Sequence, residues 1–288
     1  MRTQSADTAP EIERRQILRV RELSVARKFA AIRSTAMMLV SANIAAAHLE
    51  QTPERTSADA HDAAKFVTRQ YGLSVSPELA MAIDQRRGQA HGQFDIQAAL
   101  LDVTGALHDM RIRYALVGQL ACALYGFPRP VFTLDLLTNS PAAQLAAFSA
   151  QPNSGLLMCE PTGAQDPVSA KQQNALAQLD FLHLPTLVKI TVHRARASGF
   201  FQGLTRHACA ITLIEGTYPV LVAVPEDVVL TEIMAFQRSR DDDRWNDMLG
   251  VLKVQMPSLN LPALSELGER LGISQLLHQA VQDAGIAV

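Results

Sequence analysis

Residues 114–139 read YALVGQLACALYGFPRPVFTLDLLTN, and the order of apolar runs and turns in this stretch is the main indication of the fold. A short apolar run ends at Gly118, a second apolar segment follows, and a third run over Phe132–Leu137 contains one acid, Asp135. This spacing predicts a strand, a tight turn, a short helix and a second strand. Because side chains alternate along a strand, we expect Thr133 and Asp135 to share one face and the neighbouring leucines to share the other.

The turn at Gly118 and Gln119 has a possible chemical use. Glycine adopts the backbone angles of a strand-to-helix turn and lets a ligand approach the backbone closely. The first turn of the following helix would offer free N–H groups to an anion such as phosphate. The alternatives are purely structural: Gly118 serves an ordinary turn, and Asp135 caps a neighbouring helix or pairs with Arg129.

The rest of the chain alternates between helical and strand patterns. Residues 11–49 lack Pro and Gly, which predicts one long helix or two in line. Apolar runs on either side of Pro185, and others on either side of residues 215–217, predict two pairs of adjacent strands. Further helices are expected at residues 62–71, 76–87, 94–110, 119–125, 141–150, 225–238 and 244–255, with two more between 261 and 284. Strands interspersed with helices indicate a mixed sheet of the α/β or α+β class.

The same patterns suggest four segments. Residues 1–10 are expected to be a disordered lead-in, and residues 11–92 a helical N-terminal region. Residues 93–224 would form the domain that contains the sheet, and residues 225–288 a helical tail packed on it.

Composition places the chain among ordinary soluble globular proteins. Of its 288 residues 48% are hydrophobic and 19% are charged, and the formal net charge of −2 does not demand a nucleic acid or membrane partner. The apolar run at residues 36–47 is too short to span a bilayer. Three widely spaced cysteines match no metal-ligand spacing and suit a reducing compartment, so we expect a cytoplasmic protein.

The quoted stretch resembles the nucleotidyltransferase superfamily, especially its minimal and toxin-associated members. Those proteins carry a strand, Gly-Gly or Gly-Ser, a short helix ending in Gly-x-Pro-Arg, and then Asp-x-Asp on the next strand. The similarity continues through LVKITV (residues 187–192), where the family has a third acid on a neighbouring strand. It also includes YPVLVAVPEDVVLTEIMAFQRSR (residues 218–240) and DDRWNDMLGVLKVQ (residues 242–255). In all, it covers about Ile112 to Ala284 and implies a nucleotidyltransferase-like mixed sheet flanked by helices.

The resemblance also implies a site, although this chain departs from the family pattern. In the family, three acids hold two Mg²⁺ ions against a nucleoside triphosphate, and the metals activate the attacking hydroxyl. Here the three positions are occupied by Thr133, Asp135 and Thr191, so Asp135 is the surviving catalytic and metal-binding residue. The phosphate- and nucleotide-binding positions would be Gly118, Gln119, Arg129, Thr133 and Thr191. Because threonine is neutral, we expect transfer activity to be weakened or lost.

Three functions therefore remain open. The first is ancestral transfer of a nucleotide from a nucleoside triphosphate to a hydroxyl of RNA, protein or a small molecule. The second is a non-catalytic nucleotide- or protein-binding module, in a toxin–antitoxin or other regulatory setting, whose protein or RNA partner would contact the helical N-terminal region. The third, a DNA-binding regulator, is supported only by a helix-turn-helix shape at residues 63–87, where the basic residues come at the end of the second helix rather than at its start.

Overall fold

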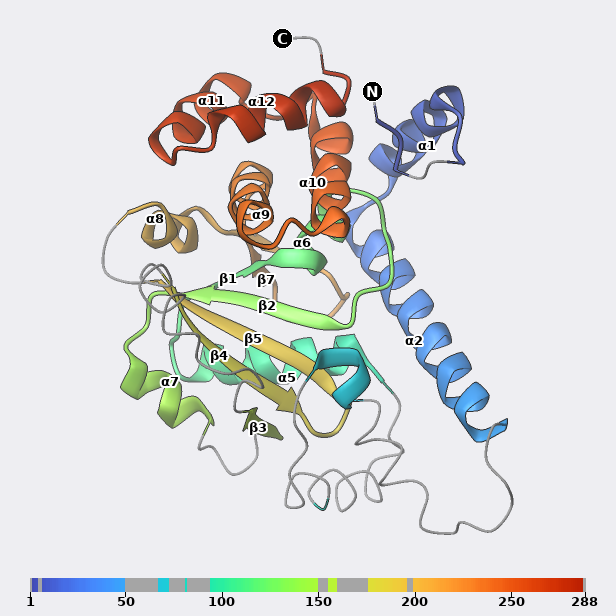
Figure 1. Cartoon of the computed structure of the whole chain (residues 1–288). Coiled ribbons are helices and arrows are strands. Elements are labelled where there is room, and N and C mark those ends of the chain that lie inside the picture. Colours follow the sequence, from blue (N-terminus) through green and yellow to red (C-terminus); the bar gives the residue numbers. More distant parts are fainter. Residues whose placement is uncertain are drawn as a thin grey trace. The chain divides into compact units, whose positions relative to one another are not determined.

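The computed structural model describes residues 2–4, 7–49, 67–72, 81, 94–149, 155–159, 176–195 and 199–286. Within them the chain has a mixed α/β fold (Figure 1). A turn of helix covers residues 67–71. The other helices are α1 (Pro10–Glu22), α2 (Val25–Leu49), α5 (Ile96–Asp109), α6 (Gly118–Tyr125), α7 (Ala142–Ser149), α8 (Phe200–His207), α9 (Pro225–Ser239), α10 (Asp242–Gln255), α11 (Leu261–Arg270) and α12 (Ser274–Asp283). The strands are β1 (Tyr114–Val117), β2 (Thr133–Thr138), β3 (Leu156–Cys159), β4 (Leu176–His183), β5 (Val188–Ala195), β6 (Cys209–Ile211) and β7 (Val220–Val222).

The strands form a seven-stranded mixed sheet in the order β3-β4-β5-β2-β1-β7-β6. Strand β1 is parallel to β7 and β2 is parallel to β5, whereas β3–β4, β4–β5 and β6–β7 are antiparallel. This arrangement confirms the mixed sheet expected from the sequence. The two strand pairs expected around Pro185 and around residues 215–217 are β4–β5 and β6–β7, so both are confirmed.

Several elements differ from the sequence-based expectation or lie beyond the described residues. The N-terminal helical stretch is two helices, one of the two arrangements expected, because Leu23 adopts an extended backbone between α1 and α2. Strand β3 and helix α8 were not expected from the sequence. Apart from residue 81, the helix expected at residues 76–87 falls outside the described residues, and of the helix-turn-helix shape at 63–87 only residues 67–72 and 81 are described.

By its internal contacts the chain divides into two compact units. Unit 1 comprises Met1–Ile32, Ala115–Val131 and Arg206–Val288, and unit 2 comprises Arg33–Tyr114 and Phe132–Thr205.

In unit 2, helices cover one face of the strands. His183 of β4 contacts Asp102 of α5, and Phe181 of the same strand packs edge-on against Phe148 of α7. Since alternate residues of β4 point to opposite faces, these contacts place α5 and α7 on the face opposite Asp180. Buried aliphatic residues of β2 and β5 share the helix-covered face, including Leu134. The other face of the same strands carries most of their polar side chains, together with buried Leu137 and Leu182.

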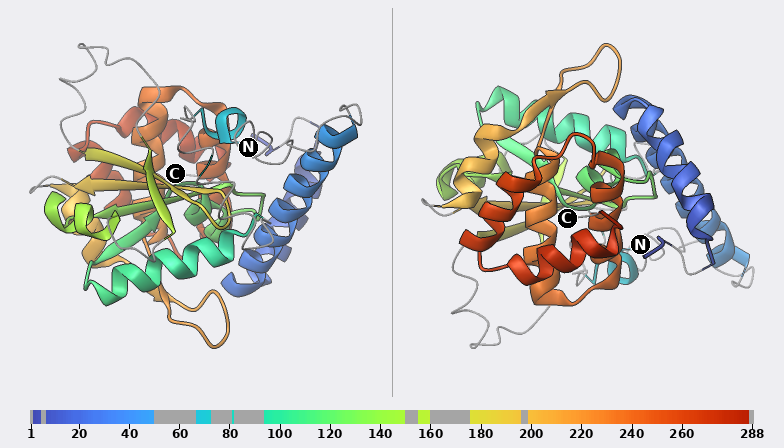
Figure 2. Two further views of the ribbon diagram at one scale, coloured as in Figure 1. Left: turned by 90° about the horizontal axis from the view of Figure 1, so that it is seen from below. Right: turned by 90° about the horizontal axis from the view of Figure 1, so that it is seen from above.

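In unit 1, helices α6, α9 and α10 pack together, and α11 and α12 lie side by side as the red pair in Figure 2. The close approach of α6 to α10 depends on Gly126, where an added Cβ would lie 2.9 Å from backbone atoms of Gly250 and Val251. The N-terminal segment, expected to be a disordered lead-in, makes hydrogen bonds: the Arg2 N–H donates to the Asp283 carbonyl over 2.6 Å. Along the described residues, no helix combines the length and apolar character that crossing a bilayer requires.

Candidate functional site

The polar face of unit 2 is organised by the register of three adjacent strands. Asp135 of β2 is the register partner of Thr191 on β5, and Thr191 is in turn the partner of Asp180 on β4. Register partners point to the same face of a sheet. The three side chains therefore form a row across β2, β5 and β4, on the face that α5 and α7 do not cover.

Further polar residues flank this row. Alternation along β5 brings Lys189 and His193 to the same face as Thr191. Lys189 is the register partner of Thr133, and His193 is the partner of Gln178. These residues, with the row itself, are called the polar face below: Thr133, Asp135, Gln178, Asp180, Lys189, Thr191 and His193.

Asp180 is held by several donors. The Thr191 hydroxyl donates to Oδ1 over 2.9 Å, and Nε2 of Gln178 lies 3.0 and 3.1 Å from the two carboxylate oxygens. Lys189 Nζ lies 3.4 Å from Oδ2, and the Asp180 side chain is only 7% exposed. These donors stabilise the buried charge, as a carboxylate in the protein interior requires. Both carboxylate oxygens of Asp180 are therefore already occupied by protein donors.

Asp135 is in a different situation. Its side chain is 17% exposed, and Oδ1 lies 3.7 Å from His193 Nε2, which is an ion-pair distance only if the imidazole is protonated. The strand is anchored by the leucines on its other face, which are fully buried. Asp135 is thus the carboxylate of the polar face that is most accessible to a ligand.

One end of the polar face is closed by Tyr71 and an apolar cluster. The Tyr71 hydroxyl lies 3.0 Å from the Phe132 carbonyl and 2.9 Å from the Leu187 carbonyl, and it accepts the backbone N–H of Lys189. Burial raises the pKa of Tyr71, so its hydroxyl stays protonated at neutral pH. Tyr71 therefore ties together the residues that precede Thr133 on β2 and those that begin β5.

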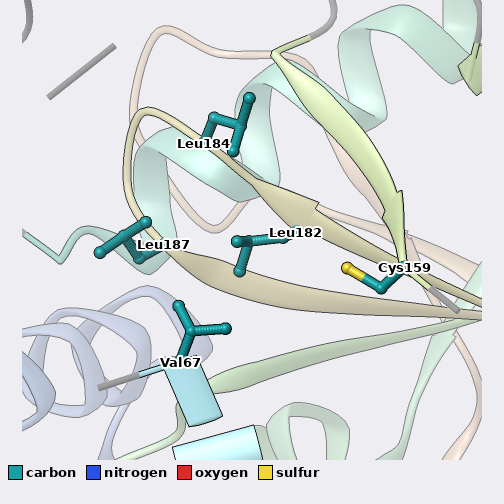
Figure 3. Close-up of a cluster of buried hydrophobic side chains, with 5 residues drawn as sticks. All are labelled: Val67, Cys159, Leu182, Leu184 and Leu187. Atoms are coloured by element: carbon teal, nitrogen blue, oxygen red, sulfur yellow. The ribbon is translucent and has the colours of Figure 1, made fainter. Parts of the chain in front are cut away.

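The apolar cluster beside Tyr71 comes from β3, β4, the β4–β5 turn and the helical turn at residues 67–71 (Figure 3). It consists of Val67, Cys159, Leu182, Leu184 and Leu187, with Leu157 and Tyr71 packed against it. Burial raises the pKa of the Cys159 thiol, so this cysteine is a neutral member of the cluster. The cluster anchors the hairpin that carries Asp180 and Lys189.

Unit 1 contains the other residues that the sequence suggested. Gly118 begins α6 directly after β1 with a positive φ of 68°, a conformation that glycine adopts without steric cost. Gln119 follows in the first turn of α6, whose N-cap, Val117, provides no side-chain hydrogen bond. Arg129 forms a bidentate ion pair with Asp247 of α10, so the structure engages its guanidinium within the protein.

The structure places Thr133, Asp135 and Thr191 on one face; strand alternation predicted the first two, and the resemblance suggested Thr191. It adds two residues that the sequence reasoning missed. Asp180 and Lys189 lie on the same face. A signal was present in the sequence, since QLDFL around Asp180 repeats the pattern of TLDLL around Asp135. Both place one acid among apolar residues on a strand; β4 pairs with one edge of β5 and β2 with the other.

The donor set of the polar face does not fit a pair of Mg²⁺ ions. Magnesium favours charged oxygen ligands, and a two-metal centre needs carboxylates that bridge or flank both ions. Here Asp135 alone is accessible, Asp180 is occupied by donors, and the remaining positions are hydroxyls. Among the residues that the structure describes, no three His, Cys, Asp or Glu side chains are grouped to hold a metal ion.

Comparisons with protein-family models and with curated proteins find no match for this chain.

Proposed function

We propose that this protein is a nucleotidyltransferase-like, nucleotide-binding protein with weakened or lost transfer activity, and that its polar face holds the phosphates of the nucleotide. The observation that supports this most directly is the row Asp135–Thr191–Asp180 across β2, β5 and β4. In the resembled family, acids on adjacent strands of a mixed sheet occupy such positions. In the row, as in the family, polar groups of adjacent strands lie on one face, but threonines stand at two of the three positions where the family has acids.

The chemistry of the row explains why binding is favoured over transfer. Nucleotidyl transfer requires the phosphate under attack to be polarised and the incoming hydroxyl to be deprotonated. Of the two acids on the polar face, Asp135 is the one placed to accept that proton, since Asp180 accepts hydrogen bonds from Thr191 and Gln178. Thr133 and Thr191 can position phosphate oxygens through their hydroxyls, but they cannot supply negative charge for a metal pair.

A regulatory role through a protein or RNA partner, in a toxin–antitoxin setting or elsewhere in the cytoplasm, is the alternative proposal. The N-terminal helices offer a specific surface for it. Arg14, Arg15 and Arg19 of α1 are exposed, whereas Arg21 is engaged by the carbonyls of Lys253 and Val254. Exposed arginines bind phosphates or acidic partners through charge. This role is compatible with nucleotide binding on unit 2.

Calorimetry with ATP, GTP and CTP, each with and without Mg²⁺, tests the proposal. We expect the wild type to bind at least one nucleotide and Asp135→Ala to change that affinity. A matched control is Asp109→Ala, which removes an exposed acid at the end of α5, the helix on the opposite face. Absence of binding to every nucleotide in both conditions would refute nucleotide binding, and an equal effect of both variants would refute the polar face as the site.

A second assay tests the loss of transfer. The protein is incubated with labelled nucleotides and Mg²⁺, and label on the protein or on added RNA is measured. We expect no label above that found with Asp135→Ala. Transfer that depends on Asp135 would show an active enzyme and contradict the weakened chemistry.

A further inference from the structure

We propose that the polar face binds phosphate without a metal ion, through a subsite built from Thr133 and Lys189. This inference rests on the proposed nucleotide binding and concerns how the charge of the phosphates is balanced. The polar face lacks the carboxylates that a pair of metal ions needs, and it carries a lysine instead. Lys189 is the register partner of Thr133, the position at which the family pattern has its first acid.

Compared with the family pattern, the charge of the subsite is shifted toward binding an anion, while the carboxylates of Asp135 and Asp180 lie on the same face beside it. Replacing an acid by the Thr133 hydroxyl removes one negative charge and adds a hydrogen-bond donor. Lys189 adds a positive charge beside it. The carboxylate paired with Lys189 is Asp180, whose charge is shared with two further donor groups, the Thr191 hydroxyl and the Gln178 amide.

Lys189 retains donor capacity for a ligand. Its Nζ lies 3.4 Å from Asp180 Oδ2, longer than a normal hydrogen bond, and an ammonium group has three N–H donors. The side chain is 17% exposed, so it is partly desolvated but not sealed within the protein. A partly desolvated ammonium attracts a phosphate more strongly than one in bulk water.

The backbone around the subsite is ordered in advance by Tyr71. Its hydroxyl contacts the carbonyl of Phe132, directly before Thr133, and accepts the N–H of Lys189. It therefore holds the two strands in register at the point where the subsite lies. Pre-organised donors bind an anion without the entropic cost of ordering them at the moment of binding.

His193 completes the arrangement at the other end of β5. It lies on the same face as Lys189, with Thr191 between them, and its side chain is 26% exposed. The ring N–H of His193 can donate to a second phosphate group of the same nucleotide or to Asp135. A polyphosphate lying along β5 would then meet Lys189 first and His193 last, which suits a nucleoside triphosphate better than a monophosphate.

The test uses the full chain and calorimetric titration with ATP in excess EDTA and, separately, in Mg²⁺. We expect ATP to bind in EDTA and Lys189→Met to weaken binding at least tenfold, as loss of a charge-assisted hydrogen bond predicts. The matched control is Arg194→Met, on the same strand but pointing to the opposite face, where we expect affinity within about twofold of the wild type.

Two further variants keep the result interpretable if Lys189→Met fails to fold. Lys189→Arg retains the charge and should bind ATP in EDTA, and Thr133→Val removes the hydroxyl with little change of shape and should weaken binding severalfold. Unchanged affinity in both Lys189→Met and Thr133→Val would overturn the subsite. If Lys189→Met is unfolded, unchanged affinity in Thr133→Val alone overturns it.

The metal conditions separate this inference from the function on which it rests. Binding that occurs only with Mg²⁺ would overturn the metal-free subsite and leave nucleotide binding intact. Absence of binding in EDTA and in Mg²⁺ would overturn both.

Discussion

The Thr191 hydroxyl on β5 donates a 2.9 Å hydrogen bond to Asp180 on β4, and the two residues are register partners in an antiparallel pair. The sequence suggested Thr191 as a weakened metal position, whereas the structure uses its hydroxyl to stabilise a second acid. The relationship has a direct consequence for any attempt to restore the family pattern. An acid at position 191 would face Asp180 across the strands.

We expect Thr191→Asp to destabilise the protein by about 1–3 kcal/mol, because a second carboxylate replaces a donor next to a buried acid. Thr191→Val, which only removes the hydrogen bond, should cost about 1 kcal/mol. Urea unfolding at neutral pH measures both. Equal stability of Thr191→Asp and the wild type would show that Asp180 and residue 191 do not face each other.

Glu13 of α1 and Lys253 of α10 form a buried ion pair in unit 1, with side chains 0% and 1% exposed and an N–O distance of 2.9 Å. Removing one partner leaves an uncompensated charge, so we expect Lys253→Met to destabilise the protein by about 3–5 kcal/mol. The double variant Glu13→Gln, Lys253→Met should recover part of that loss. A double variant as unstable as the sum of the single variants would mean that the two residues are not coupled.

Lys28 makes stability depend on pH. Burial lowers the pKa of Lys28 to about 8, although Nζ lies 3.4 Å from the carbonyls of Tyr125 and Gly126. Between about pH 8 and 10.5 the unfolded chain holds this proton more tightly than the native state. The contribution of Lys28 to the free energy of unfolding should therefore rise with pH, by at most about 1.4 kcal/mol per pH unit.

The effect of Lys28 has to be measured by comparing the wild type with a variant, because the buried thiols lower the free energy of unfolding as pH rises. Burial raises the pKa of Cys122 and Cys159, so these residues lower stability as the unfolded thiols ionise. Urea unfolding of the wild type and of Lys28→Met is compared from pH 7 to 10. The gap between the two curves should shift in favour of the wild type as pH rises; a constant gap would place the pKa of Lys28 at its ordinary value.

A variant of Arg129 can distinguish a structural role of this residue from a phosphate-binding role. Arg129 is paired with Asp247, whose side chain is 10% exposed, while its own is 34% exposed. We expect Arg129→Met to lower stability by on the order of 2 kcal/mol, since the buried carboxylate loses its counter-charge. Nucleotide affinity measured by calorimetry should stay unchanged. A loss of affinity with unchanged stability would instead assign Arg129 to the phosphates.

Local patterns in the sequence predicted much of the fold. The apolar period of α9, together with Pro225 at its start, and the alternation in β2 depend only on neighbouring residues, so they can be read without tertiary contacts. Strand β3 could not be predicted in the same way. It has four residues, and its existence depends on pairing with β4 rather than on its own composition.

The candidate site also has a part that local sequence patterns predicted and a part that depends on long-range contacts. Periodicity alone placed Thr133 and Asp135 on one face of a strand, because side-chain direction follows from backbone geometry. Which residues join them is set by long-range register: the pairing of β4 with β5 brings Asp180 next to Thr191, and that of β2 with β5 brings Lys189 next to Thr133. Strand register depends on packing between segments distant in sequence. The sequence by itself therefore determined the elements and the lone acid on β2, and only the tertiary structure decided that a second acid and a lysine share its face.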